Sequence, residues 1–379
     1  MTADAIILGL GGMGSAAAYH LARRGHSVLG FEQYSFGHDR GSSHGHTRII
    51  RTAYYEHPSY VPLVRRAFTL WSELEENENA RRRLLTPCPC LNIGPPDGEV
   101  ILGVQAAARE HDLSIEMLSA QAIERRFPAF HIPNGFVGVL EHRAGILAVE
   151  ECVLAHHRAA VQTGHADLRA DERIVSWKPV GDGVEVRTTL GTYTAAKLIV
   201  TAGAWAGRML ADIGLPLTVM RQVMHWFDAE PTGPFGLGQF PIFLVEAPEG
   251  AFYGLPSFDE RGFKCARHYG APELASPDEI DWKTGPLDEL AVRPFLNCYL
   301  PTAGECSASQ VCMYTLTPDR HFIIDVHPEY PQVVLASGFS GHGFKFAPTV
   351  GEIIADLAAD GRTEHAIELF RLNRFGASP

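Results

Sequence analysis

The segment from residue 37 to 60, "GHDRGSSHGHTRIIRTAYYEHPSY", gathers side chains that could bind an anion. Arg48 and Arg51 are three positions apart, and on a helical turn two such residues would share a face. With His44 nearby in the sequence, the two cations predict an anion site beside a bound ligand. Spacing alone supports a pair of solvated surface arginines equally well.

A second segment, "GFSGHGFKF" at 338–346, is predicted to lie beneath a flat ligand. It connects an apolar strand, "QVVLAS", to a helix that ends at Gly361. In open α/β sheets, ligands bind where strands end and helices begin. Its glycines remove side chains that would hold a flat ligand away from the backbone, and Lys345 adds a compact cation. This pattern favours a surface beneath a planar, electron-accepting ring over a loop with an exposed lysine.

The elements that would position these residues begin at the N-terminus, in "AIILGLGGMGSAAAYHLARRGHSVLGFEQ". The pattern predicts a strand to Leu8, a glycine turn, a helix through Arg24 and a second strand ending at Glu32. Glycines at 9, 11 and 14 suit a tight turn, a backbone close to a pyrophosphate, and close packing of helix on strand. A carboxylate at Glu32 favours a ribose with a free 2′-hydroxyl and disfavours NADP, so FAD and NAD remain open.

The rest of the chain does not continue as an NAD dehydrogenase usually does, with further strand and helix units of one sheet. A helix is predicted from about residue 60 to 76, a hairpin around Gly181-Asp182-Gly183, and a buried strand in "AAKLIVTAGAWAGRML". The interval 218–312 is rich in proline, aromatic residues and turn residues. It predicts a second, mainly antiparallel sheet that covers one side of the cofactor.

Composition limits the classes of partner. The chain has 379 residues and a formal net charge of −12, which argues against nucleic acid and anionic membranes. No apolar run approaches the roughly 20 residues of a membrane-spanning helix. Seven scattered cysteines indicate a reducing cytoplasm rather than a disulfide framework. Cys88 and Cys90 lack a second pair at zinc spacing, so no metal site is expected.

Five motifs together carry a family resemblance: "GLGGMG", "GSSHGHTRIIR", "AFYGLPSF", "VCMYTLTPDRHFIID" and "GFSGHGFKF". In this order they closely resemble the monomeric sarcosine oxidase and N-methyl-L-tryptophan oxidase family of D-amino acid oxidase-like flavoenzymes. The resemblance implies FAD and an α/β fold, with a Rossmann-like domain and a mainly antiparallel substrate domain. It also implies a monomer that oxidises a secondary amino acid with O2, giving an imine and hydrogen peroxide.

The resemblance assigns roles to residues at the flavin. Cys312 matches the cysteine that holds the flavin covalently through its 8α-methyl group, although spacing alone would make it a buried thiol. His44 and Arg48 match residues beside the flavin ring. The expected cofactor-binding positions are Gly9, Gly11, Gly12, Gly14, Glu32, Ser42, Thr47, Arg48, Cys312, Gly341, Gly343, Phe344 and Lys345.

The resemblance also assigns the substrate cavity. Arg51 and Lys345 match the pair that binds the substrate carboxylate, and Lys264 matches the lysine near which oxygen is activated. The residues that match the cavity lining are Tyr253, His268 and Tyr314. The expected catalytic set is therefore Lys264, Arg48, His44, His268, Tyr253 and Tyr314, and the expected substrate-binding set is Arg51, Lys345, Tyr253 and His268.

Two positions depart from the family pattern: Ser43 stands where a histidine is usual, and His46 where an acid is usual. Sarcosine is the first expected substrate, with N-methyl-L-tryptophan or a cyclic imino acid of the pipecolate or proline type as alternatives. A flavin dehydrogenase or electron-transfer flavoprotein is the alternative from another class. The expected domains are 1–83, 145–216 and 313–379 for FAD, and 84–144 and 217–312 for the substrate.

Overall fold

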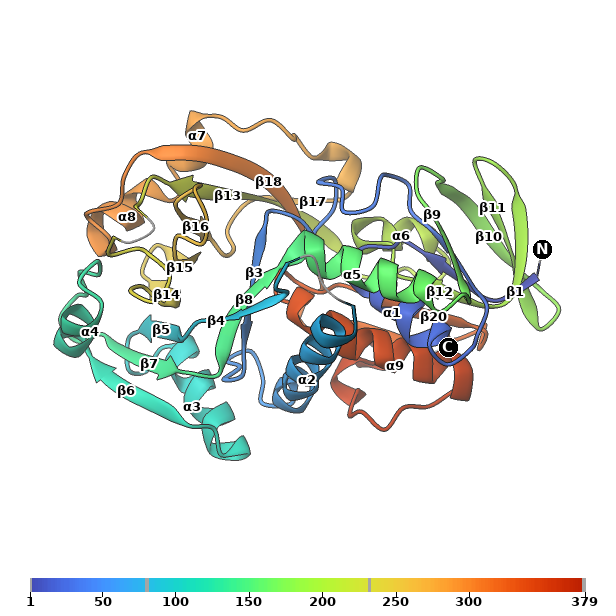
Figure 1. Cartoon of the computed structure of the whole chain (residues 1–379), viewed down its shortest axis with the longest axis horizontal. Helices are drawn as coiled ribbons and strands as arrows, with labels where there is room; N and C mark the ends of the chain where they lie inside the picture. Colours follow the sequence, from blue (N-terminus) through green and yellow to red (C-terminus); the bar gives the residue numbers. More distant parts are fainter. Residues whose placement is uncertain (1, 79–81, 231–232, 377–379) are drawn as a thin grey trace.

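Two large sheets and a small third sheet between them organise the molecule, for which the computed structural model describes residues 2–78, 82–230 and 233–376 (Figure 1). The termini lie in the half that contains the first large sheet. The second large sheet forms the other half, so the small sheet connects the two parts of the molecule.

The first sheet is the α/β unit that the N-terminal sequence predicts. Its strands are β10 (Ile174–Val180), β11 (Gly183–Thr188), β12 (Thr192–Val200), β1 (Thr2–Leu8), β2 (Val28–Phe31) and β9 (Ala166–Arg169), with β20 (Val333–Ser337) beside β12 and β19 (Ile323–Val326) beside β20. Strand β1 pairs in parallel with both β2 and β12, and Ile6 faces Leu29 and Leu198 across the ladders. These strands are continuous apolar runs, as expected for a parallel sheet covered on both faces.

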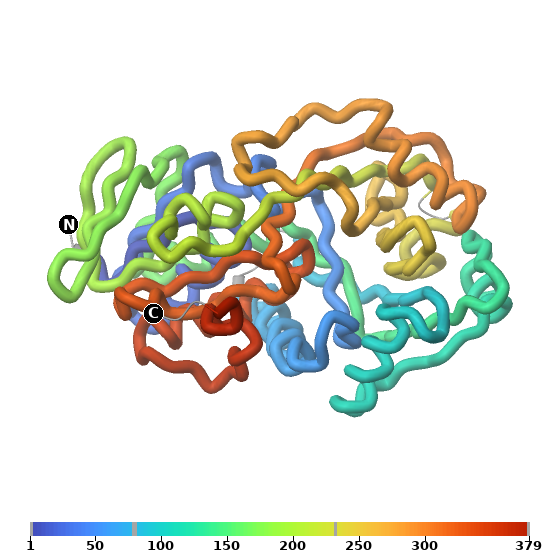
Figure 2. The backbone as a smooth tube through the Cα atoms, turned by 180° about the vertical axis from the view of Figure 1, so that it is seen from behind, coloured from blue at the N-terminus to red at the C-terminus, as the bar shows by residue number. Residues whose placement is uncertain are grey.

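Helices α1 (Gly12–Ala22), α2 (Tyr60–Glu78), α5 (Val149–Gln162) and α9 (Ala347–Asp360) belong to this half. Although α1 and α9 lie at opposite ends of the chain, they are side by side (Figures 1 and 2). A Cβ atom at Gly351 would lie 2.6 Å from Ala16, so glycine is needed for this close approach. Helix α9 ends at Gly361 as predicted, and α1 ends two residues before the predicted Arg24.

The second sheet is mainly antiparallel, as predicted. Its strands, in spatial order, are β17 (Glu273–Leu274), β13 (Thr218–Phe227), β16 (Phe263–Arg267), β15 (Gly250–Leu255), β14 (Ile242–Ala247), β5 (Cys90–Gly94), β7 (Val137–Glu141) and β6 (Ile115–Ser119), with β18 (Cys306–Leu316) also paired to β13. The pair β5 and β14 is parallel. Stacked rings such as Phe252 and Phe295, 4.2 Å apart, build its core.

The other α-helices of the described chain are α3 (Glu99–His111), α4 (Ala120–Arg126), α6 (Ala206–Met209), α7 (Pro286–Glu289) and α8 (Arg293–Tyr299). Among the described residues, no helix combines the length and apolarity that crossing a membrane requires.

The small sheet corrects one expectation. Strands β3 (Thr47–Arg51), β4 (Leu85–Pro87) and β8 (Ala144–Ala148) form it, and β3 is central to the site described below. Arg48 and Arg51 were expected to share a face on a helical turn, and that prediction is wrong. On a strand, residues three apart point to opposite faces, so the two arginines meet different surroundings.

Candidate active site

One cavity runs from the carboxyl end of β1 to the loop after β20. Its lining contains most of the residues singled out from the sequence, drawn from both large sheets and from β3 between them. Those residues are Gly9, Gly11, Gly12, Glu32, Ser42, Thr47, Arg48, Arg51, Tyr253, His268, Cys312, Tyr314, Gly341, Gly343, Phe344 and Lys345. His44 and Lys264 are buried beside this lining, where they contact Cys312 and the β3 segment respectively.

The glycine turn after β1 has the geometry that its sequence requires. Gly9 has φ +86°, and a Cβ atom at Gly14 would lie 1.8 Å from the Gly9 carbonyl oxygen. The buried Glu32 carboxylate accepts a hydrogen bond from the Leu10 amide at 3.0 Å. Glu32 thus holds the turn in place as well as facing the cavity, a role that the sequence pattern did not predict.

The second glycine segment packs directly against the second sheet. Gly341 has φ +82°, and a Cβ atom there would lie 2.4 Å from the Tyr314 ring. A Cβ atom at Gly343 would lie 2.4 Å from Phe339. These glycines let the backbone of residues 338–345 form one wall of the cavity.

Three basic side chains surround the Cys312 thiol. The Arg48 guanidinium donates from Nη2 to the Ser42 carbonyl oxygen at 2.9 Å and lies 3.5 Å from Cys312 Sγ. Burial raises the pKa of Cys312, but His44, Arg48 and Lys264 outweigh it and hold the pKa at about 7. A cysteine in such an electropositive setting carries a large thiolate fraction near neutral pH and is a competent nucleophile.

Lys264, on β16, is buried against the segment that precedes and begins β3. Its Nζ donates to the carbonyl oxygens of Gly45 at 2.8 Å and Thr47 at 3.1 Å. Burial and the positive charge of Arg48 lower the pKa of Lys264 well below its ordinary value. The sequence pattern alone gave no indication of these carbonyl partners.

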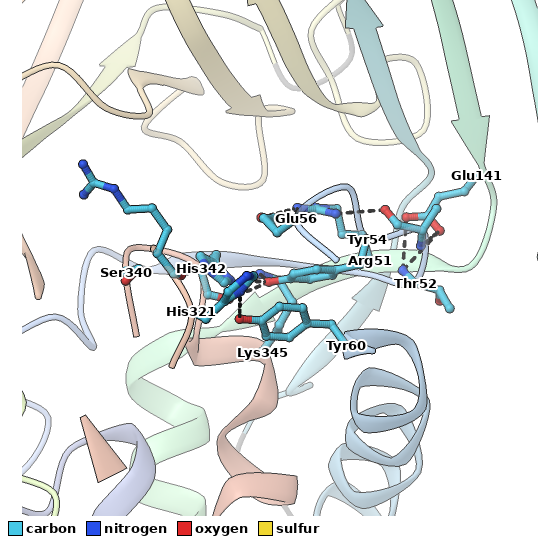
Figure 3. Close-up of polar contacts among 12 residues, drawn as sticks. Arg51, Thr52, Tyr54, Glu56, Tyr60, Glu141, His321, Ser340, His342 and Lys345 are labelled. Carbon is cyan, nitrogen blue, oxygen red and sulfur yellow. Dashed lines mark hydrogen bonds and ion pairs between the residues drawn. The ribbon is translucent and has the colours of Figure 1, made fainter. Parts of the chain in front are cut away.

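Arg51 and Lys345 come together at the other end of β3 (Figure 3). Both are buried, and the Lys345 ammonium donates to the His342 carbonyl oxygen at 2.7 Å and to Tyr54 Oη at 3.3 Å. Arg51 Nη2 donates to both carboxylate oxygens of Glu56 at 2.7 Å. Glu56 was missed, although an acid five residues after a candidate anion-binding arginine is a visible clue.

Burial and the charge of Arg51 together set the protonation states of Glu56 and Lys345 at this end of β3. Burial raises the pKa of Glu56, but the charge of Arg51 prevails and lowers it to about 2. Burial also lowers the pKa of Lys345 to about 7, with Arg51 acting in the same direction. Glu56 therefore stays ionised, whereas the charge of Lys345 changes near neutral pH.

The aromatic lining consists of Tyr253, His268 and Tyr314. His268 Nδ1 lies 3.3 Å from Tyr314 Oη, and the rings of Tyr253 and His268 are 5.8 Å apart. Burial lowers the pKa of His268 to about 3 and raises that of Tyr253 to about 12. These three side chains are therefore neutral near pH 7, in a weakly polar part of the cavity.

The residues present fit FAD. The Thr315 hydroxyl, which lines the cavity, is buried without a hydrogen-bond partner among the described residues. Buried polar atoms of this kind normally have a partner, which a bound polar group would supply. The glycine turn leaves its backbone accessible to a pyrophosphate, and Glu32 faces the same space.

Comparison with known proteins settles the family. Residues 4–357 match the model of the family described as FAD dependent oxidoreductase. The chain belongs to this family. FAD as the cofactor and the two-sheet flavoenzyme fold are thus confirmed predictions, and the protein is an FAD-dependent oxidoreductase.

Individual relatives of this FAD-dependent oxidoreductase match along their whole length. A monomeric sarcosine oxidase from Streptomyces avermitilis is 43% identical, covering 100% of this chain and 99% of its own. N-methyl-L-tryptophan oxidase from Escherichia coli K12 is 36% identical, covering 99% and 100%. Among solved structures, the open form of NikD, an unusual amino acid oxidase essential for nikkomycin biosynthesis, superimposes with a TM-score of 0.86 at 27% identity, covering 98% and 97%.

Proposed function

We propose that this protein is an FAD-dependent oxidase of secondary amino acids, with sarcosine as the first candidate substrate. The relatives named sarcosine oxidase, which match full length, support the reaction class. The observation that carries the proposal is the pair of buried cations, Arg51 and Lys345, in the wall of the cavity. Fixed cations in a desolvated site suit the carboxylate that every amino acid carries.

Glu56 indicates how such a carboxylate would bind. Its two oxygens both accept from Arg51 Nη2 at 2.7 Å, a contact that a substrate carboxylate would also make. Binding therefore exchanges one carboxylate for another at Arg51, so the guanidinium is never left buried without an anion. This exchange avoids the large cost of an unpaired buried charge.

The uncharged side chains that line the cavity favour the unprotonated form of the substrate amine. An ammonium group must lose its proton before the C–H bond beside nitrogen can give up two electrons. Desolvation next to Tyr253, His268 and Tyr314 favours the neutral amine, because charged groups lose more hydration than neutral ones. The low pKa of His268 keeps that ring uncharged, so it can hydrogen-bond to the amine without repelling a nearby cation.

The overall reaction that we propose for sarcosine consumes O2 and water and gives glycine, formaldehyde and hydrogen peroxide. Bound FAD supplies the two-electron acceptor for the amine and the two-electron donor for O2. We assign Lys264 to the step with O2, since a positive group stabilises the negative charge that develops on oxygen. Arg48 and His44 are assigned to the surroundings of the flavin, with the remaining cofactor contacts as expected from the sequence.

A substrate panel with peroxide detection tests the proposal. We expect peroxide with sarcosine, and the same assay with N-methyl-L-tryptophan, pipecolate and proline measures the alternatives. Peroxide from a primary amino acid alone would contradict the proposal. Reoxidation of the substrate-reduced protein in air should be rapid, whereas slow reoxidation with a faster artificial acceptor would indicate a dehydrogenase.

We further propose that the flavin is attached covalently through Cys312. The lowered pKa of this buried thiol supports its role as the attacking group. The C–S bond would replace a C–H bond of the 8α-methyl group, and the two electrons released would pass through the flavin to O2, the oxidant of the proposed reaction. Acid precipitation of the purified protein should leave the yellow colour in the pellet, and Cys312→Ser should release it to the supernatant. Colour released from the unsubstituted protein would contradict the covalent link while leaving FAD as the cofactor.

The remaining expectations are also proposals. We propose that the molecule is a monomer, in keeping with the names of its relatives. A cytoplasmic location is in keeping with seven cysteines that are all free. We propose that the two large sheets are centred in the two discontinuous domains expected from the sequence, joined by the small sheet.

A further inference from the structure

The carboxylates of Glu141, which is buried, and Glu150, which is mostly buried, bind the two ends of β3 in the same way. Glu141 accepts from the amides of Thr52, at 3.1 Å to each of its oxygens, and of Ala53, at 2.7 Å. Glu150 accepts from the amides of Gly45 at 2.7 Å and His46 at 3.0 Å. In each case one carboxylate binds the backbone N–H groups of two consecutive residues.

The topology explains why the two glutamates reach opposite ends of one strand. Strand β3 pairs antiparallel with β8, so that Thr47 faces Ala148 and Arg51 faces Ala144. Glu141 ends β7 just before β8, and Glu150 begins α5 just after it. The two glutamates therefore flank β8 in the sequence and β3 in space.

We propose that Glu141 and Glu150 are positioning residues, which fix the two ends of β3 and so place Arg51 and Arg48 in the cavity wall. We call the two contacts the Glu141 clamp, to Thr52 and Ala53, and the Glu150 clamp, to Gly45 and His46. The part of this inference that concerns binding of a substrate carboxylate at Arg51 rests on the proposed function.

The Glu141 clamp acts on the residues that follow Arg51. Arg51 Nη1 donates to the carbonyl oxygen of Ala53 at 2.8 Å, and Ala53 is the residue whose amide Glu141 holds. Figure 3 shows Glu141, Thr52 and Arg51 in this arrangement at the end of the strand. The guanidinium is thus fixed through its own backbone, in addition to its ion pair with Glu56.

The Glu150 clamp acts on a backbone in an uncommon conformation. Gly45 has φ +90° and His46 has φ +67°, and a residue with a side chain adopts such angles only at some cost. Two amides bound to one carboxylate offset this cost. The same turn aims the carbonyl oxygens of Gly45 and Thr47 at Lys264 Nζ, so Glu150 positions the lysine partners at the flavin end.

The clamps should respond differently to pH. Burial raises the pKa of Glu141 to about 7. Burial also acts to raise the pKa of Glu150, but the hydrogen bonds that it accepts from backbone amides, including those of His46 and Gly45, outweigh burial and lower this pKa. The ionisable groups that face Glu141 are Arg51 at the end of β3 and Cys90, its neighbour on β5, while its neighbour on β6 is Ile115. The Glu141 carboxylate therefore loses its negative charge as pH falls through 7, whereas the Glu150 carboxylate keeps its charge.

The test compares Glu141→Gln with Glu150→Gln, each of which removes a charge at nearly constant size. The first readout is amide hydrogen exchange, which does not depend on the proposed function. We expect faster exchange at Thr52 and Ala53 only in Glu141→Gln, and at Gly45 and His46 only in Glu150→Gln. Unchanged exchange at the clamped amides in both variants would overturn the proposal.

The second readout is the Kd of acetate, a carboxylate without an amine, measured from the flavin absorption of the holoenzyme. At pH 8 we expect about a tenfold weaker Kd in Glu141→Gln, as for loss of a hydrogen bond to a charged group, and less than about a twofold change in Glu150→Gln. The ratio of the Kd of Glu141→Gln to that of the unsubstituted protein should fall towards one at pH 6, because protonated Glu141 resembles glutamine. Lys345 titrates in both proteins, so its effect cancels in this ratio.

The outcomes separate the two proposals. Equal acetate binding in Glu141→Gln and the unsubstituted protein at pH 8, with faster exchange at Thr52, would show that the clamp does not position Arg51 and would overturn the inference. If the unsubstituted protein binds neither acetate nor sarcosine, the proposed carboxylate site fails, and hydrogen exchange alone decides whether the clamps hold β3. A weaker Kd at pH 8 that persists undiminished at pH 6 would contradict the titration of Glu141.

Discussion

The two arginines of β3 show how one short strand can supply two different electrostatic settings. Arg51 is buried and forms an ion pair with Glu56, and its guanidinium also lies 4.3 Å from the centre of the Tyr54 ring. Arg48 is partly exposed and contacts carbonyl oxygens and the sulfur atoms of Met224 and Cys312. No carboxylate pairs with Arg48 in residues 2–78, 82–230 and 233–376.

The difference indicates two uses of positive charge. At the Arg48 end, with Lys264 nearby, no carboxylate of the described residues neutralises the guanidinium, and such a cation can stabilise negative charge that develops during a reaction. At the Arg51 end, the cation is neutralised until another carboxylate replaces Glu56. The first setting suits a chemical step and the second suits binding, and the predictions below test this division.

The largest expected effect concerns the Arg48 end. We expect Lys264→Met to slow the reaction of the reduced protein with O2 by about 10²- to 10³-fold, as for loss of a preorganised electrostatic group. Reduction by substrate should change little. Stopped-flow measurement of the two half-reactions checks this, with the exposed Lys178→Met as a matched control. Equal slowing of both half-reactions would contradict the assignment of the Arg48 end to a chemical step and of the Arg51 end to binding.

At the Arg51 end, we expect Arg51→Ala to raise KM for carboxylate substrates by about 10- to 100-fold, while the flavin stays bound. The physical reason is the loss of a charge-assisted hydrogen-bonding partner in a desolvated site. Oxidation of a secondary amine without a carboxylate serves as the control and should keep its KM. An unchanged KM for amino acids would place the carboxylate elsewhere.

Lys345 should make binding depend on pH. Burial lowers its pKa from the usual value near 10.5 to about 7, so the ammonium is present below pH 7 and is lost as pH rises. We expect the ratio of kcat/KM for the unsubstituted protein to that for Lys345→Met to fall about tenfold between pH 6 and 9. The ratio of Lys345→Arg to Lys345→Met should stay flat, because arginine keeps its charge. A flat ratio for both would show that Lys345 does not titrate in this range.

The smallest effect should come from Glu56→Gln. Removing the charge that competes for Arg51 should lower KM for carboxylate substrates about threefold, since the substrate then displaces only a neutral amide. Steady-state kinetics measure this, with the exposed Glu249→Gln as a control. A raised KM would mean that Glu56 supports the substrate instead of competing with it.

Much of the fold followed from local sequence patterns. The glycine turn after β1, the hairpin of β10 and β11, the Gly361 helix end and the mainly antiparallel second sheet were all predicted. The turn, the hairpin and the helix end depend on residues that are close in the chain, whereas the second sheet was predicted from the composition of residues 218–312. Strand β3 was missed because its five residues lie among glycines and histidines, and its pairing partner β8 is about a hundred residues away.

The candidate site was predicted only in part. The resemblance named the cations, tyrosines and histidines, and the structure places most of them in the lining of one cavity, with His44 and Lys264 buried beside it. Glu56, Glu141 and Glu150 were missed. Nothing in the spacing of Glu141 marks it, because its contacts with Thr52 and Ala53 span 89 and 88 residues.

The sequence by itself determined the type of scaffold, because glycines, apolar runs and a terminal acid specify a dinucleotide-binding unit through local geometry. Only the tertiary structure decided the charges at the site. The pKa values of Cys312, Lys345 and Glu141 all lie near 7 because of burial and of neighbours that come from distant segments. Desolvation and pairing exist only after those segments meet, so no local pattern could have predicted them.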